Sequence, residues 1–203
     1  MSLSGPELPQ RFSLPGADLL LYPRLDLGDQ QTLLQRLVEQ TSWQQEYLTL
    51  YGKTHPQPRL VAWHGDAGAR YTYSGIAHSP QPWTDQLLWL RDRVQSLCGH
   101  AFNSVLLNYY RDGRDSMGLH ADDEPELGER PVIASLSLGA ERKLYFRHRS
   151  RRDLETFQLA LPSTSLLIMA GDTQANWKHG MRKLSRDCGP RVNLTFRWIY
   201  YNG

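Results

Sequence analysis

The 203-residue sequence predicts an α+β protein that is mainly β, with helices in its N-terminal half and a core of antiparallel strands after residue 102. Two observations support this. Apolar side chains recur at helical spacing in residues 33–38 and 83–97, whereas short segments rich in β-formers follow one another from about residue 102 onward. Many short strands without intervening helices favour antiparallel pairing in a sandwich or jelly roll.

The expected elements follow in chain order. Residues 1–16 show no periodicity and are expected to form an irregular N-terminal arm before a single domain at residues 17–203. Asp29 is a suitable N-cap for a helix that ends near Gln40, and a second helix runs from Pro82 to about Cys98. Strands are expected at residues 46–53 (with a turn), 59–62, 70–75, 104–110, 132–138, 144–147, 157–161, 165–169 and 191–201.

Composition narrows the class of protein. A hydrophobic fraction of 40% and a charged fraction of 22% are typical of a globular chain. No apolar run approaches the roughly 20 residues of a membrane span, and the first residues do not form a signal peptide. The protein is therefore expected inside the cell, in the cytoplasm of a bacterium or the nucleus of a eukaryote. A net charge of +2 indicates no polyanion partner by itself, so local clusters of charge must be considered.

The segment 118–124 places one imidazole and three carboxylates within five residues. In an extended backbone His120 and Asp122 project to the same side, so both side chains can bind one ion. A distant second histidine would complete the arrangement of two imidazoles and one carboxylate that suits non-haem Fe(II). The pair alone also fits an ordinary solvated loop, so its assignment depends on the rest of the chain.

Two later segments bear on that assignment. His179 follows the predicted strand 165–169, and its separation from His120 is compatible with opposite ends of a small β-barrel meeting at one metal. From Arg191 to Arg197, Arg, Asn, Thr and Arg alternate with Val, Leu and Phe. Such a strand buries one apolar face and carries two guanidinium groups on the other. Their forked geometry suits a dicarboxylate.

A basic segment at residues 142–152 contains six Lys or Arg residues with two aromatic rings between them. Such a segment is typical of a groove that binds phosphates. The alternative is a solvated hairpin whose charge is balanced elsewhere. The candidates for phosphate contacts are Arg147, Arg149, Arg151 and Arg152, with Lys183 and Arg186 as extensions.

Taken together, His120-x-Asp122, the later His179 and Arg191-x-Asn193-x-Thr195-x-Arg197 resemble the AlkB family of Fe(II)- and 2-oxoglutarate-dependent dioxygenases, whose members oxidatively demethylate nucleic-acid bases. The resemblance spans about residues 50–197. It implies the family fold, a double-stranded β-helix or jelly roll, at about residues 102–201. It also implies Fe(II) as the metal and 2-oxoglutarate as the co-substrate. The implied iron ligands are His120, Asp122 and His179; the implied 2-oxoglutarate contacts are Asn108, Tyr110, Arg191, Asn193 and Arg197, with Thr195 supporting the strand.

On the substrate side, the resemblance implies a nucleotide-recognition region at about residues 46–80. Tyr71 and Tyr73 share one face of a predicted strand and correspond to the family's base-binding hairpin. A flipped base is expected to lie between Tyr73 and the ring of His120. Asp123 and Glu124 match the acidic pair of the DNA-acting subgroup. Asp123 is expected to face a cationic base, and Glu124 to order the loop.

The segment Leu50-Tyr51-Gly52 occupies the place of a hairpin that some double-strand-acting members insert into the duplex. Together with the basic segment, it implies a nucleic-acid partner, DNA more than RNA, for a monomeric protein that does not bind membranes. The choice between DNA and RNA, and between single and double strands, stays open at this level.

The expected function is oxidative demethylation of lesions such as 1-methyladenine and 3-methylcytosine in DNA repair, with release of formaldehyde, succinate and CO2. Two other classes remain. A 2-oxoglutarate-dependent hydroxylase or demethylase of a protein or small molecule would keep the triad and the arginines, but would not need Tyr73, Asp123 or the basic segment. A non-catalytic nucleic-acid-binding module would not need all three metal ligands.

Overall fold

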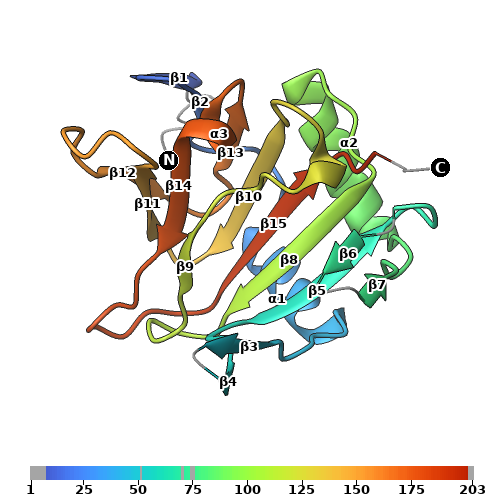
Figure 1. Cartoon of the computed structure of the whole chain (residues 1–203). Helices are drawn as coiled ribbons and strands as arrows, with labels where there is room; N and C mark the ends of the chain where they lie inside the picture. The colour runs from blue at the N-terminus through green and yellow to red at the C-terminus, as the bar shows by residue number, and fades with distance from the viewer. Residues whose placement is uncertain (1–7, 51, 70, 74–75, 201–203) are drawn as a thin grey trace.

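The computed structural model describes residues 8–50, 52–69, 71–73 and 76–200, and Figure 1 shows two facing antiparallel sheets. The larger sheet has the strand order β1-β2-β13-β10-β15-β8-β5, and the smaller has the order β12-β11-β14-β9. The strands of the larger sheet are β1 (Gln10–Leu14), β2 (Ala17–Tyr22), β5 (Leu60–Gly65), β8 (Ser104–Tyr110), β10 (Ile133–Gly139), β13 (Leu166–Ala170) and β15 (Arg191–Arg197). Those of the smaller are β9 (Met117–His120), β11 (Arg142–His148), β12 (Phe157–Leu161) and β14 (Trp177–Met181).

Two helices cover the outer face of the larger sheet (Figure 1). Asp29 caps α1 (Gln30–Gln40) by accepting hydrogen bonds from the backbone N–H groups of Gln31 and Thr32. The second helix, α2 (Asp85–Cys98), ends at Gly99, whose left-handed backbone suits a glycine. Both helices bury one apolar stripe against the sheet, as predicted from the spacing of their apolar residues.

Because side chains alternate along a strand, β15 faces two different environments. Val192, Leu194 and Phe196 pack in the cluster beneath the helices. The polar row between them faces the smaller sheet, and its members from Arg191 to Thr195 are also buried. A second apolar cluster, which includes Leu144, Met169 and Met181, lies between the two sheets. The two facing antiparallel sheets confirm the predicted mainly β jelly-roll core.

Several local predictions are corrected. Residues 10–14 are not irregular, because β1 pairs with β2 across the turn at Pro15 and Gly16. The predicted strand 70–75 is a hairpin of β6 (Tyr71–Tyr73) and β7 (Ile76–His78). The strand predicted to reach residue 201 ends at Arg197. The region 46–53 forms the hairpin of β3 (Tyr47–Leu50) and β4 (Lys53–Pro56).

The remaining elements are short. A 3-10 turn, η1 (Pro125–Leu127), follows the segment 118–124, and α3 (Thr173–Asn176) precedes β14. Among the described residues, no helix is both long enough and apolar enough to cross a membrane.

Candidate active site

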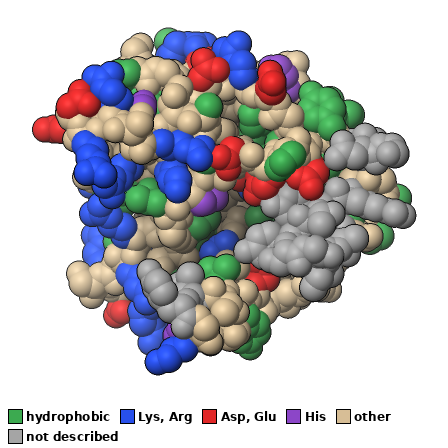
Figure 2. Space-filling view, in the orientation of Figure 1, with side chains coloured by type: hydrophobic (Ala, Val, Ile, Leu, Met, Phe, Trp, Pro, Cys, Tyr) green, Lys and Arg blue, Asp and Glu red, His purple; other side chains and the backbone are tan. Residues whose placement is uncertain are grey.

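A cavity of about 600 Å³ lies between the two sheets. Figure 2 shows the molecular surface hollowed at this place, with a histidine visible in the hollow. Its lining comes from β3, β5, β8, β10, β13, β15 and the smaller sheet, together with the segment 121–127. Polar groups from several strands thus converge on a space otherwise lined by apolar side chains, which is the usual form of a small-molecule site.

The predicted metal ligands meet in this cavity. His120 ends β9 and His179 lies in β14, and the two are direct cross-strand partners with ring centroids 4.5 Å apart. One ligand atom from each of His120, Asp122 and His179 lies within 4.8 Å of the others. The histidines are therefore neighbours in one sheet, and not at opposite ends of a barrel, with which their separation in the sequence was also compatible. A hydrogen-bonded strand pair brings them together although the sequence separates them.

The electrostatics of the triad favour a bound cation. Burial and, to a smaller extent, the nearby His120 lower the pKa of His179 to about 3, so the ring is neutral and has a lone pair available. Burial opposes ionisation of Asp122, but Arg197 and the two histidines outweigh it, and the pKa of Asp122 stays below its usual value. Its Oδ2 is buried without a hydrogen-bond partner among the described residues and lies 3.6 Å from His179 Nε2.

Backbone contacts fix the ligands in place. The Asp122 backbone N–H donates to Gln174 Oε1 in α3 at 3.0 Å. His120 Nδ1 lies 3.0 Å from the carbonyl oxygen of Gly118, which leaves Nε2 for a metal. Together with the unpaired Asp122 oxygen, these contacts fit a facial set of two imidazoles and one carboxylate.

The inward row of β15 supplies a site for an anion. Arg191 is 1% exposed, and its Nη2 donates to Ser137 Oγ at 2.9 Å. Its Nε and Nη1 have no partner among the described residues. Burial lowers the pKa of Arg191 to about 10, so the side chain keeps its charge at neutral pH. A buried guanidinium with two free donors fits a carboxylate, as a dicarboxylate co-substrate requires.

The other predicted co-substrate residues also line the cavity. Tyr110 packs against Arg191, whose guanidinium carbon lies 5.2 Å from the ring centre. Asn193 donates to Ser135 Oγ and accepts from Thr195, which gives Thr195 the supporting role expected of it. Arg197 differs, because its Nη2 pairs with Asp122 Oδ1 and so links the β15 row to the metal ligands.

Sequence reasoning missed Arg59. Its Nε donates to Asn108 Oδ1 at 2.7 Å, and both side chains line the cavity. An arginine that directly follows Pro58, at the start of a predicted strand, carries no local signal, since its partner lies 49 positions along the chain. The structure thus adds a third cavity arginine to Arg191 and Arg197.

The predicted substrate-binding residues do not all line the cavity. Glu124 lines the cavity, whereas Asp123 lies outside the lining and forms an ion pair of 2.6 Å with Arg149. The roles expected of them, Asp123 toward a cationic base and Glu124 in ordering the loop, stay predictions. The backbone of Tyr71 and Tyr73 forms β6, but these two side chains, that of Leu50, and all of Tyr51 lie outside the described part; Gly52 is exposed.

The side chains of the basic segment 142–152 do not all reach the surface, because strand β11 directs them alternately inward and outward. Arg142 is buried and donates to three backbone carbonyls, so it takes no part in the surface. Arg147 and Arg152 are exposed, whereas Arg151 pairs with Asp153 at 2.6 Å. Arg147 lies opposite Lys178 of β14. Figure 2 shows Lys and Arg side chains gathered on the side of the molecule that β11, β12 and β14 occupy in Figure 1.

Comparison with known proteins agrees with this site. Residues 20–197 match the family model described as "2OG-Fe(II) oxygenase superfamily". The chain is 42% identical over 189 residues to the mouse "Alpha-ketoglutarate-dependent dioxygenase alkB homolog 3", covering 89% of this chain and 65% of that one. It is 42% identical to the bovine "DNA oxidative demethylase ALKBH2" over 186 residues, covering 89% and 67%.

The chain spans about 65% of the length of the first curated relatives it matches. "The structure of OsALKBH1", 18% identical, superposes with a TM-score of 0.66 over 94% of this chain and all of that one, which shows the fold. The predicted Fe(II) and 2-oxoglutarate are confirmed by the family match and by the His-Asp-His group. The chain therefore belongs to the AlkB family within the 2OG-Fe(II) oxygenase superfamily.

Proposed function

We propose that this protein oxidatively demethylates alkylated bases in nucleic acid, DNA more than RNA. The observation that carries the proposal is the His120, Asp122 and His179 group in one cavity with the buried guanidinium of Arg191, whose Nε and Nη1 have no hydrogen-bond partner among the described residues. The names of the relatives, "DNA oxidative demethylase ALKBH2" among them, support the substrate class.

Different residues of the cavity have different roles in the proposed reaction. Iron bound by the triad, with 2-oxoglutarate and O2, supplies the oxidation of a methyl group. Arg191 would bind a carboxylate of 2-oxoglutarate, and Asn193 and Tyr110 line the pocket beside it. Arg197 orients Asp122 through their ion pair. Because Asp122 and His179 are buried, water is largely excluded from this part of the site.

The surface of β11 and β14 supports a polyanion as the partner. Arg147 and Lys178 are exposed cross-strand neighbours. Like charges directly opposite each other destabilise a sheet. A phosphate backbone bound to this outer side of the smaller sheet would neutralise them.

The test is formaldehyde release from a matched panel of oligonucleotides with 1-methyladenine or 3-methylcytosine, as single- and double-stranded DNA and RNA. Wild-type protein with Fe(II) and 2-oxoglutarate is expected to release formaldehyde from the DNA substrates, and His120→Ala is expected to release none while keeping its circular dichroism spectrum. No release from any nucleic acid, with 2-oxoglutarate still consumed, would favour a protein or small-molecule substrate. A chain that neither binds Fe(II) nor turns over 2-oxoglutarate would favour a non-catalytic module.

A further inference from the structure

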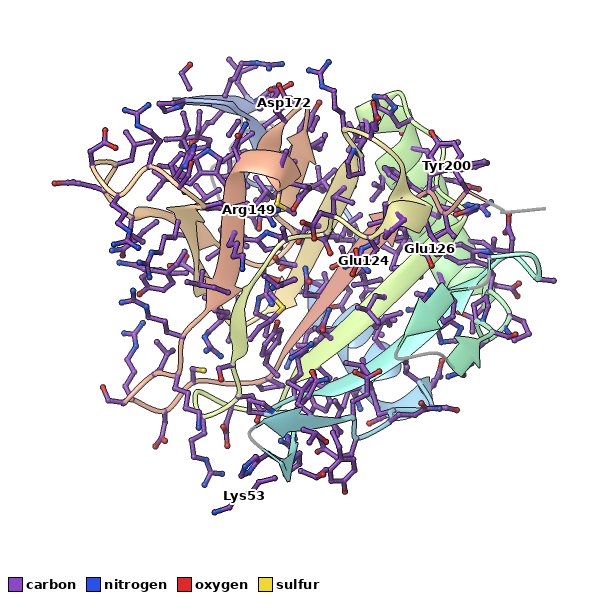
Figure 3. The ribbon with its side chains drawn as sticks, viewed as in Figure 1. Lys53, Glu124, Glu126, Arg149, Asp172 and Tyr200 are labelled. Atoms are coloured by element: carbon purple, nitrogen blue, oxygen red, sulfur yellow. The ribbon has the colours of Figure 1, made fainter. Side chains whose placement is uncertain are left out.

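The ion pair between Arg149 and Asp123 joins two segments. Asp123 belongs to the segment 118–124, which carries the metal ligands His120 and Asp122, and Arg149 belongs to the basic segment 142–152. Arg149 follows β11, and Asp123 directly follows the ligand Asp122. Figure 3 shows the Arg149 side chain beside β14 and Glu124 to the right of it, near η1. Arg149 Nη1 lies 2.6 Å from Asp123 Oδ2, and it also donates to the carbonyl oxygen of Gln174 at 3.2 Å.

This pair is accessible and therefore easily exchanged. The Arg149 side chain is 37% exposed and that of Asp123 is 45% exposed. Exposed ion pairs contribute little, because water solvates both partners when they separate. The second contact, to Gln174, would keep Arg149 near the rim after Asp123 had left it. Asp123 is held outside the cavity lining, whereas its neighbours Asp122 and Glu124 are part of that lining.

We propose that Arg149 is a specificity-determining residue: it forms an ion pair with Asp123 at the edge of the cavity and gives up this pair to a base that carries positive charge. This inference rests on the proposed function and deepens it. A base methylated at a ring nitrogen that accepts a hydrogen bond in the normal pair, such as N3 of cytosine in 3-methylcytosine, is a cation, and it replaces Arg149 as the partner of Asp123. A neutral base such as 3-methylthymine offers no replacement charge, so the pair persists. Released Arg149 becomes available to a phosphate beside the flipped nucleotide.

The exchange predicts the direction of a selectivity change. In Arg149→Gln, a cationic base no longer competes with a guanidinium, and a neutral base leaves Asp123 without a partner. The ratio of affinities for 3-methylcytosine over 3-methylthymine is therefore expected to rise by about two- to fivefold, the range set by an exposed ion pair. In Asp123→Asn the ratio is expected to fall. In the double variant, Arg149→Gln is expected to have no further effect on the ratio, since its partner is gone.

The experiment measures binding of two otherwise identical single-stranded oligonucleotides by fluorescence anisotropy, without oxygen, and formaldehyde release from both with oxygen. Arg152→Gln is the matched control, because it removes an exposed arginine of the same segment; it should weaken both oligonucleotides equally. An unchanged ratio in Arg149→Gln overturns the proposal, and so does a changed ratio that persists with Asp123→Asn. If wild type binds both oligonucleotides but releases no formaldehyde from either, the proposed function fails while the ratio still tests Arg149.

Discussion

At the scale of single residues, the site is marked by buried polar atoms that lack a partner among the described residues. Asp122 Oδ2 and two nitrogens of Arg191 are such atoms. Each unpaired atom costs about 1–3 kcal/mol, which a bound cation or carboxylate offsets. Residue type and spacing were enough to predict these side chains. They were not enough for Arg59 or for the pair of Asp123 with Arg149, because those contacts join distant segments.

Arg191→Lys separates charge from geometry at the co-substrate site. Lysine keeps the charge but has no fork, and it loses the hydrogen bond to Ser137. The KM for 2-oxoglutarate is expected to rise at least about tenfold, the equivalent of one lost charge-assisted hydrogen bond. Fe(II) affinity, measured by anaerobic titration, should stay within about twofold. Arg197→Lys is the contrast, since it should weaken both ligands; equal losses in the two variants would contradict the division of roles.

Asp115 is expected to make the stability of the fold depend on pH. It accepts hydrogen bonds from Arg111 Nε and Nη2 at 2.8 and 2.9 Å. Burial raises the pKa of Asp115, but the hydrogen bonds from Arg111 lower this pKa by more than burial raises it, so the net shift is downward. An acid whose pKa is lowered by folding stabilises the fold above its ordinary pKa of about 3.9 and loses that contribution as the pH falls through the folded value.

Asp115→Asn is therefore expected to lower the free energy of unfolding by about 1–2 kcal/mol at pH 7, as for loss of a hydrogen bond to a charged group. The difference from wild type should shrink below about pH 4. Urea denaturation at several pH values measures it, and a difference independent of pH would show that the charge of Asp115 is not the cause.

At the scale of elements, sequence patterns predicted those whose signal is local. The predicted bounds of β8 and β12 match the structure, and α2 ends where the glycine after it indicated. The two strands that hold the histidines, β9 and β14, were missed. Both are short and contain glycine, and only their pairing with each other and with β11 makes them strands. The ligands of the metal site could thus be predicted from residue types and spacing, but the sequence did not show that they lie on paired strands of one sheet.

Gly180 and Gly118 form a matched test of that strand pair. A Cβ added at Gly180 would lie 3.0 Å from the backbone of Gly118 and Met117, whereas one at Gly118 would meet nothing within 4 Å. Gly180→Ala is expected to push β9 away from His179, to cost about 1–3 kcal/mol of stability and to weaken Fe(II) binding about tenfold or more. Gly118→Ala should leave both near wild type. Urea denaturation and anaerobic Fe(II) titration measure the two effects, and similar results for both variants would count against a close strand contact.

At the scale of the whole molecule, the near-neutral net charge of +2 conceals an uneven distribution. The helices cover the outer face of the larger sheet, so the smaller sheet is the one whose outer side carries exposed Lys143, Arg147 and Lys178. The sequence predicted the basic segment, but it counted Arg142, which folding buries, and omitted Lys178, which β14 brings beside Arg147. Charge on a surface depends on sheet pairing, which local patterns do not encode.

The cavity also links ligand binding to the stability of the whole fold. Its polar groups come from both sheets, so a metal and a dicarboxylate would cross-link them. A ligand at a hundred times its dissociation constant adds about 2.7 kcal/mol to stability, which for a domain of this size raises Tm by about 5–10 °C.

Mn(II), a redox-inactive substitute for iron, together with 2-oxoglutarate is expected to give a rise of about that size in a thermal denaturation scan. Chelation should reverse the rise. His179→Ala should remove most of the increase, because a ligand from the smaller sheet is lost, while Arg152→Gln should keep it. An increase that survives in His179→Ala would place the bound metal somewhere other than the triad.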